Sequence, residues 1–337
     1  MAATRWAVSP SHPCLRGSCN LTVHEASGTA PLSMDPMQHP LKTYPALVAT
    51  MVFWGLSFVA TKIALESIPT FTLVFTRFSL AALIFLFLRR GRKWPSFTRK
   101  DHVKMALLAL FEPGLYFIFE TIGLQHTSAP KTALIIATIP VVVLVLGALM
   151  LGERAGGTSV IGIFLSFGGI ILLVIGDPEF GWSLEGSLLG DLLIGGAVIS
   201  ASLYMIFARD LGRRYSSFEI TFVQIVYGAV FFCLPFFWEV PSLAWSFITP
   251  RSSLAVLYLT VFSTVGAFLC YNYALSQVPV SRAAVFVNGI PVVTAIGAWV
   301  LLDERLTVIQ AGGGALVLAA VFITNLPPGL IRKKKRP

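Results

Sequence analysis

The sequence predicts an all-α integral membrane protein with ten transmembrane helices. Three features predict this: the chain is strongly apolar, it contains ten apolar segments of membrane-spanning length, and its second half repeats its first. Of its 337 residues, 55% are hydrophobic and 12% are charged, whereas soluble domains carry about 25% charged residues. The mean hydropathy is +0.78. One protein core cannot bury so much apolar surface, so lipid must cover the remainder.

The ten apolar segments follow one another with short polar connections. Each can cross about 30 Å of hydrocarbon at about 1.5 Å per residue. Lipid offers no partners to backbone N–H and C=O groups, so only helices or a closed barrel can span it, and the alternating pattern of a barrel is absent. We therefore expect helices at about 45–66, 71–89, 104–125, 131–151, 158–176, 187–208, 217–238, 253–276, 282–302 and 307–326.

Polar tails flank the apolar region. Residues 1–43 are rich in Pro, Ser, His and Thr and lack an apolar run, which predicts a disordered cytoplasmic tail. Met34 and Met37 stand directly before the first apolar segment, so the upstream stretch is also a candidate start-site extension. Residues 327–337 are predicted to form a basic cytoplasmic tail that touches anionic lipid headgroups.

The basic residues predict the orientation. With both termini inside, 20 of the 25 lysines and arginines lie in inner tails and loops, and only Lys131, Arg251 and Arg305 lie on the outer side. Positive charge collects on the cytoplasmic side of membrane proteins. The sequence therefore predicts a multi-pass protein of the cell membrane whose N- and C-termini are both cytoplasmic.

The two halves match without gaps at an offset of 151 residues. Pro140 matches Pro291, and Glu153–Arg154 matches Glu304–Arg305. Each half contains five spans, an odd number, so the second copy must enter the membrane from the opposite side. Such inverted repeats recur in secondary transporters, whose two halves exchange inward-open and outward-open shapes. The predicted repeats cover 44–176 and 187–326.

Three short motifs stand in or after these segments, and two of them occupy corresponding places in the two halves. Phe53–Phe58 reads Phe-Trp-Gly-Leu-Ser-Phe in the first segment, Leu151–Arg154 reads Leu-Gly-Glu-Arg after the fourth, and Leu302–Arg305 ends the ninth in the same way. Together they resemble the EamA family of the drug/metabolite transporter superfamily over about residues 45–326. The resemblance implies a carrier of ten helices in two inverted EamA-type repeats, often an exporter of amino acids, other metabolites or drugs.

Four charged residues lie inside predicted spans, where a charge is costly and indicates function by default. They are Lys62, Arg77, Glu112 and Glu120. Lys62 and Arg77 lie near the outer span ends, so their long side chains can reach headgroups or pair with a carboxylate. Glu112 lies roughly 12 Å into its span, which is too deep for a carboxylate to reach water.

The third segment presents an acidic face beside a predicted helix break. Pro113–Gly114 directly follows Glu112 and should kink or open the helix. Tyr116 and Glu120 follow at helical spacing, so two carboxylates and a phenol would share one face. For Glu112 we favour proton coupling or binding of a substrate amine. A structural ion pair with one of the two basic residues is the alternative, and it is favoured for Glu120.

Several other side chains are candidates either for solute contacts or for interhelical hydrogen bonds. They are Trp54, Ser57, Tyr204, Gln224, Tyr271, Asn272 and Asn288. Pro140 and Pro291 lie mid-span in corresponding helices, which predicts paired kinks. Glu153, Arg154, Glu304 and Arg305 lie at tight turns, where Glu can cap the next helix and Arg can satisfy the preceding carbonyls, so we interpret them as structural.

Other function classes find little support. The net charge is +9, but the basic residues lie between apolar segments and at the C-terminus rather than on a polar domain. This argues against nucleic-acid binding. The five histidines lie in the tail or at span edges, and no metal, nucleotide-binding or catalytic motif lies inside, which argues against an enzyme and against cofactors. Cys14 and Cys19, near His12 and His24, lack the spacing of a zinc site. A receptor or scaffold without transport is the alternative from another class.

The sequence thus predicts a secondary active transporter, favoured as an exporter, that moves a small organic solute by alternating access. The acidic third segment favours an amino-acid-like, amine-bearing or aromatic solute, with protons as a candidate coupling ion. Exchange of phosphorylated or anionic metabolites is the alternative within transport, and it would require facing basic side chains near mid-span. The sequence leaves both a monomer and a homodimer open.

Overall fold

Helices form every regular element in the described part of the computed structural model, which comprises residues 40–124, 126, 129–153, 156–176, 188–240, 248–302 and 307–324. This confirms the predicted all-α class. The predicted tails lie outside these residues, except that 40–43 already belong to the first helix.

The helices form two series in which the elements follow one another in the same order, and residues 177–187 separate the two series. The first series is α1 (Pro40–Leu65), α2 (Thr70–Leu88), α3 (Arg99–Ala109), the π-helical turn η1 (Leu110–Leu115), α4 (Tyr116–Leu124), α5 (Ala129–Ile136), α6 (Ile139–Leu151) and α7 (Gly157–Ile175). The second is α8 (Leu188–Leu211), α9 (Ser217–Glu239), α10 (Pro250–Tyr258), the π-helical turn η4 (Leu259–Gly266), α11 (Ala267–Gln277), α12 (Val280–Val287), α13 (Ile290–Leu302) and α14 (Val308–Thr324).

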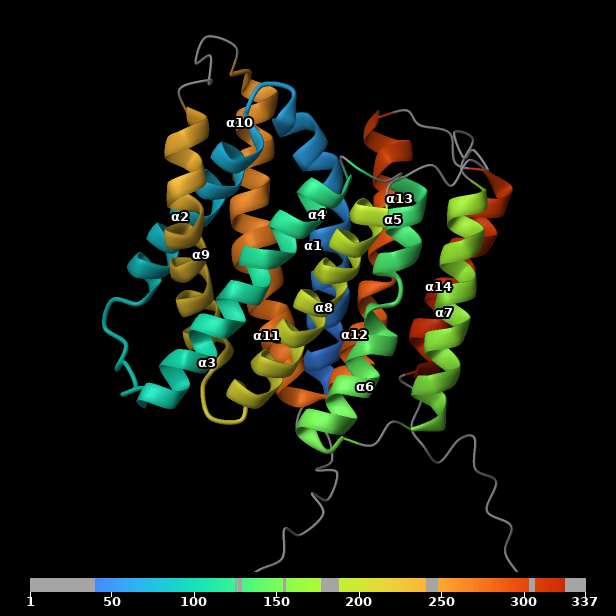
Figure 1. Ribbon diagram of the computed structural model, residues 1–337, viewed down its shortest axis with the longest axis horizontal. Coiled ribbons are helices and arrows are strands. Elements are labelled where there is room, and N and C mark those ends of the chain that lie inside the picture. The colour runs from blue at the N-terminus through green and yellow to red at the C-terminus, as the bar shows by residue number, and fades with distance from the viewer. Residues whose placement is uncertain are drawn as a thin grey trace, which may run out of the picture. The chain divides into compact units, whose positions relative to one another are not determined.

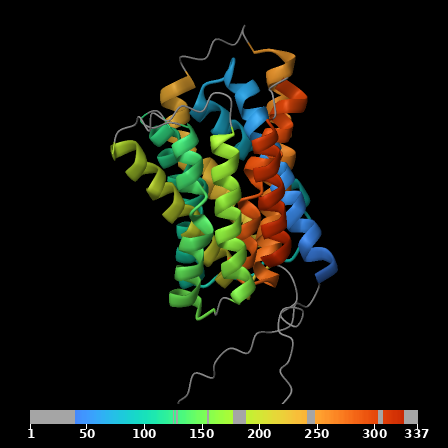
Figure 2. The same ribbon diagram turned by 90° about the vertical axis from the view of Figure 1, so that its right-hand side faces the viewer.

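Alone or joined to their neighbours along the chain, most of these helices form stretches that are long and apolar enough to cross a membrane. Among the described residues, eight helical stretches of at least 18 residues meet that description. Two further apolar helices, α6 and α14, are shorter, with 13 and 17 residues. The helices lie alongside one another in both views (Figures 1 and 2). Large apolar side chains such as Phe164 and Leu234 stay exposed on their outer faces, where lipid would cover them.

The element boundaries repeat at constant offsets. The threonine that caps α3, Thr98, corresponds to Thr249, which caps α10, at an offset of 151 residues. The same offset relates the first residues of α5 and α12, of α6 and α13, and of α7 and α14. α2 and α9 begin at an offset of 147 instead, directly after Pro69 and Ser216. Both series also contain a π-helical turn at the same place.

The packing follows this correspondence. α7 packs along α14, and α2 packs along α9. α1 contacts α11 and α13. Its counterpart α8 likewise contacts α4 and α6, which are the counterparts of α11 and α13. Aromatic rings fill the centre between α2, α8, α9 and α11, and the fully buried ones include Phe78, Tyr204, Phe232, Phe268 and Tyr271. Each series therefore completes its packing on the other one.

Glycines set the distance between α7 and α14. A Cβ atom on Gly169 would lie 2.8 Å from the carbonyl oxygen of Gly313 and 2.6 Å from a methyl carbon of Val317. The neighbouring Gly168 faces open space, since its Cβ would meet only a Leu316 methyl group at 4.0 Å. Between helices in lipid, such small residues let the backbones approach and gain van der Waals contact.

Gly169→Ala should therefore destabilise the protein by about 1–3 kcal/mol, the usual cost of overpacking a tight interface. Gly168→Ala is the matched control, and it should be neutral or slightly stabilising because alanine favours a helix. Thermal unfolding of the detergent-purified variants measures the difference. Equal melting temperatures for the two variants would contradict the described helix spacing.

Candidate functional site

A cavity of about 390 Å³ opens between the two series of helices. This volume suits a small organic molecule. Its polar lining comprises Trp54, Ser57, Thr61, Thr70, Arg77, Glu112, Tyr116, Glu120, Thr121 and Ser263. The apolar lining includes the rings of Phe58, Phe117 and Phe268. The structure thus brings together six of the residues that the sequence indicated as candidates, from α1, α2, η1 and α4.

The helix break at Glu112 places this residue at the cavity. Its backbone is extended (φ −146°, ψ 118°) between two helical stretches. Pro113 has no N–H group to continue the α-helical ladder. In a regular α-helix the N–H of Tyr116 would bond to the carbonyl of Glu112, but here it bonds to the carbonyls of Phe111 and Pro113. The break therefore puts a carboxylate and a displaced carbonyl at the same point of the chain.

The acidic face continues along α4. The Tyr116 hydroxyl donates a hydrogen bond to Oε1 of Glu120 over 3.1 Å, and both side chains line the cavity with Glu112. Two carboxylates and a phenol thus lie on one wall. Such a wall can bind a proton or an ammonium group.

Arg77 brings a cation to the same cavity, but its bonds differ from the predicted ion pair. Within the described residues, its Nε donates to the Thr264 hydroxyl over 2.7 Å and its Nη2 to the Ser263 hydroxyl over 3.1 Å. The guanidinium also lies 5.6 Å from the ring centre of Phe78 and 5.8 Å from that of Phe117. Hydroxyls and aromatic rings, rather than Glu112 or Glu120, thus hold this buried cation.

The other basic candidate lies elsewhere. Lys62 is exposed in the last turn of α1 and is not among the described residues that line the cavity. Its position suits a side chain that reaches the headgroup region.

Three candidates form a buried polar network behind the cavity wall. Gln224 donates from Nε2 to the carbonyl of Glu112 over 2.9 Å. Asn272 donates to Oε1 of Gln224 over 3.0 Å and to the Thr221 hydroxyl over 2.9 Å, and it accepts from the Tyr204 hydroxyl over 2.9 Å. Each of these side chains is fully buried except Glu112. The network therefore supports the helix break. Its side chains, Gln224, Asn272, Tyr204 and Thr221, do not line the cavity.

Tyr271 also lies behind the wall. Its hydroxyl donates to the sulfur of Met205, and its ring centre lies 5.1 Å from that of Trp54. The Trp54 indole N–H donates to the carbonyl of Ser263 over 3.2 Å, and the Ser57 hydroxyl donates to the carbonyl of Trp54 over 2.7 Å. Tyr271 and these contacts therefore orient the cavity-facing indole.

The predicted kinks at Pro140 and Pro291 coincide with interruptions of the helices. Both prolines are the second residue of a new helix, α6 or α13, after a two-residue break. Asn288 lies in the second break and donates to the Ser166 hydroxyl over 2.9 Å and to the Ala137 carbonyl over 3.4 Å. Ala137 is its counterpart at the 151-residue offset, so this bond joins the two equivalent breaks.

Glu153 caps a helix, but a different one from the one expected. It accepts a hydrogen bond from the backbone N–H of Val280, the first residue of α12, over 2.9 Å, whereas α7, the next helix, has no side-chain cap. It also pairs with Nε of Arg209 over 3.0 Å. Because α12 begins beside the end of α6, this partner from the other repeat is nearer than sequence order implies. Arg154, Glu304 and Arg305 lie outside the described residues.

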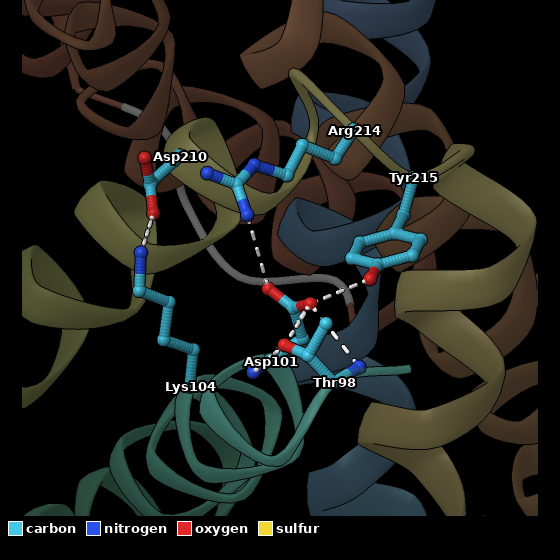
Figure 3. Close-up of polar contacts among 6 residues, drawn as sticks. All are labelled: Thr98, Asp101, Lys104, Asp210, Arg214 and Tyr215. Carbon is cyan, nitrogen blue, oxygen red and sulfur yellow. Dashed lines mark hydrogen bonds and ion pairs between the residues drawn. The ribbon is translucent and has the colours of Figure 1, made fainter. Parts of the chain in front are cut away.

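A charged cluster joins the two repeats at the end of the bundle where α8 connects to α9, which we call the α8–α9 end (Figure 3). Asp101 accepts from the Tyr215 hydroxyl over 2.8 Å and lies 3.5 Å from Nη1 of Arg214. Lys104 pairs with Asp210 beside it. Burial, and then the bond to Asp101, raise the pKa of Tyr215, so the phenol stays a donor at neutral pH. Sequence reasoning missed this cluster, although the Thr98-x-x-Asp101 capping box was a readable signal.

The opposite end, where α1 connects to α2, repeats this contact with neutral groups. Ser252 corresponds to Asp101 at offset 151, and Ser67 corresponds to Arg214 at offset 147. Their hydroxyls form a hydrogen bond of 2.7 Å. Equivalent contacts thus join the repeats through charges at the α8–α9 end and through hydroxyls at the α1–α2 end.

Comparison with known proteins gives one family match to each half. The model of the EamA-like transporter family matches residues 41–175 and 188–326. Two proteins of Archaeoglobus fulgidus, each named an uncharacterized transporter, are 29% and 31% identical over 84% of this chain, and the matches cover 98% and 97% of those proteins. The uncharacterized transporter YcxC of Bacillus subtilis is 30% identical over 87% of this chain and 96% of its own length.

A solved crystal structure shares the fold as well. It superposes with a TM-score of 0.68 at 19% sequence identity and covers 83% of this chain and 95% of that one. With the family model matched in both halves and relatives aligned over most of their length, this multi-pass membrane chain belongs to the EamA-like transporter family.

Proposed function

We propose that the protein is a secondary active transporter that moves a small amino-acid-like or amine-bearing solute by alternating access. The proposed direction of transport is export. One observation carries the proposal: a cavity between the two repeats receives the Glu112 carboxylate from a broken helix. Broken helices beside a central cavity are a recurrent way for transporters to expose charge and backbone polarity to a solute in lipid.

The lining suits a solute that carries a positive group. Glu112 and Glu120 can hold an ammonium group, and either can take up a coupling proton in its place. A guanidinium has five N–H donors. Two of those of Arg77 go to Ser263 and Thr264, so others can serve a solute carboxylate. The rings of Trp54 and Phe117 supply apolar and cation–π surface.

The two ends of the bundle support alternation. We infer ten spans in two inverted repeats, with the α8–α9 end facing the cytoplasm. Exchange between the two open forms requires equivalent contacts at the two ends to break in turn. Asp101–Arg214 and Ser252–Ser67 are such a pair of contacts.

Exchange of anionic metabolites is the second candidate within transport. It is favoured by Arg77, which adds a cation to the cavity lining. The carboxylates of Glu112 and Glu120 oppose it, because they would repel a phosphate group at close range. Competition assays in liposomes distinguish the two, since zwitterionic amines should inhibit uptake under the first proposal and phosphate esters under the second.

Glu112→Gln should leave the protein folded and reduce uphill transport in proteoliposomes about 10- to 100-fold. The substitution keeps the shape but removes a charge-assisted hydrogen bond, which contributes about 1.5–3 kcal/mol. Glu219→Gln is the matched control, because Glu219 is an N-terminal capping residue outside the cavity and glutamine also caps there.

Counterflow of labelled solute separates the two roles of Glu112. This exchange needs no proton gradient, so loss of uphill transport alone would indicate proton coupling, and loss of both would indicate solute binding. Wild-type uphill transport, pH dependence and melting temperature in Glu112→Gln would refute both roles.

The orientation predicts which loops a reagent reaches. In a protein with its four native cysteines replaced, Trp182→Cys should react with an impermeant thiol reagent in whole cells, and Lys93→Cys should react only after the cells are opened. The reason is that 182 lies in the connection of α7 and α8, and 93 in that of α2 and α3, on opposite sides of the predicted membrane. The reverse labelling pattern would invert the topology.

A further inference from the structure

The break in η1 leaves one carbonyl in need of a donor. In a regular α-helix the carbonyl of Glu112 would accept from the N–H of Tyr116, but that N–H bonds to Phe111 and Pro113. A buried carbonyl without a partner is costly, and more so where lipid replaces water. The amide of Gln224 fills this place from α9, at 2.9 Å.

Gln224 is itself held rigidly. Its Oε1 accepts from Asn272, which the Tyr204 and Thr221 hydroxyls hold in turn. Gln224 and these three side chains are almost completely buried, with exposed fractions of 0% for Gln224 and Asn272. Gly228, one turn further along α9, brings that helix against Pro113, since a Cβ there would lie 2.7 Å from the proline ring. The donor therefore has little freedom to move.

The second repeat supports its π-helical turn η4 in a similar way, although the helix there is not broken. Ser263 in η4 corresponds to Glu112 at offset 151, and its carbonyl accepts from the Trp54 indole of the first repeat. Arg77 corresponds to Gln224 at offset 147, and it donates to the Ser263 hydroxyl. In each repeat a polar side chain from the second helix of the other repeat thus donates to the π-helical turn, to a backbone carbonyl in η1 and to a side-chain hydroxyl in η4.

We propose that Gln224 is a positioning residue, which fixes the backbone of Glu112 and so holds its carboxylate toward the cavity. Gln224 does not line the cavity, so it acts on the solute only through Glu112. This inference rests on the proposed function of Glu112. It also gives Arg77 a second role, as the equivalent support of the π-helical turn η4 through the Ser263 hydroxyl.

Gln224→Met tests the proposal, because it keeps the length of the side chain and removes both hydrogen bonds. Transport efficiency, kcat/KM in counterflow per folded protein, should fall about 3- to 10-fold, as expected for one lost neutral hydrogen bond that positions a binding group. Gln310→Met is the matched control. Gln310 is also buried but caps α14 through Thr307, away from the cavity, so its substitution should lower stability alone.

The decisive measurement is the double variant with Glu112→Gln. If Gln224 acts through Glu112, Gln224→Met should lower efficiency less than about twofold further in the Glu112→Gln background. An equal loss in both backgrounds, or an equal loss per folded protein in Gln310→Met, would overturn the positioning role. If Glu112→Gln impairs transport and Gln224→Met does not, only the positioning role fails. If Glu112→Gln has no effect, the proposed function of the site fails with it.

Gln224→Glu covers the case in which the methionine variant does not fold. A protonated carboxyl group can donate to the Glu112 carbonyl, whereas a carboxylate cannot. With equal pH on both sides of the vesicle, counterflow by Gln224→Glu should therefore recover toward the wild-type rate as pH falls. A pH profile parallel to that of the wild type would contradict the proposal.

Discussion

The need of every backbone carbonyl for a donor governs this structure, because hydrocarbon supplies none. An irregular turn in a membrane helix is therefore tolerated only where another part of the protein or a water-filled cavity supplies the missing bond. At Glu112 that bond comes from Gln224, and at the equivalent Ser263 it comes from Trp54. Both donors belong to the opposite repeat. The same hydrogen bonds thus support the cavity wall and contribute to the contact between the two repeats.

The duplicated framework carries different chemistry in its two copies. Glu112 faces the cavity where the second repeat has Ser263, and α2 supplies Arg77 where α9 supplies Gln224. The carbonyls of Glu112 and Ser263 each accept a bond from the other repeat, although only Glu112 leaves helical geometry. The charges are not shared, since the neutral Ser263 stands where the first repeat has Glu112. The acidic wall is therefore concentrated on the first repeat.

Much of the fold and part of the site could be predicted from the sequence. Glu112, Pro113 and Tyr116 follow one another within five residues, so local geometry sufficed to indicate an interrupted helix with an acidic face. The pairing of Arg77 could not be predicted, because Thr264 and Ser263 lie more than 180 residues away along the chain. Glu153 was likewise assigned to the next helix, whereas it caps α12, 127 residues further on.

The sequence by itself determined the all-helical membrane class, the repeat and the residues of the acidic face, because hydrophobic periodicity and spacing act over one or two helical turns. Only the tertiary structure decided which polar residues line the cavity and which support it. Trp54 and Arg77 reach the cavity, whereas Gln224 and Asn272 are buried behind its wall. The physical reason is that a hydrogen bond depends on distances of about 3 Å between atoms from different helices, and helix packing alone sets those distances.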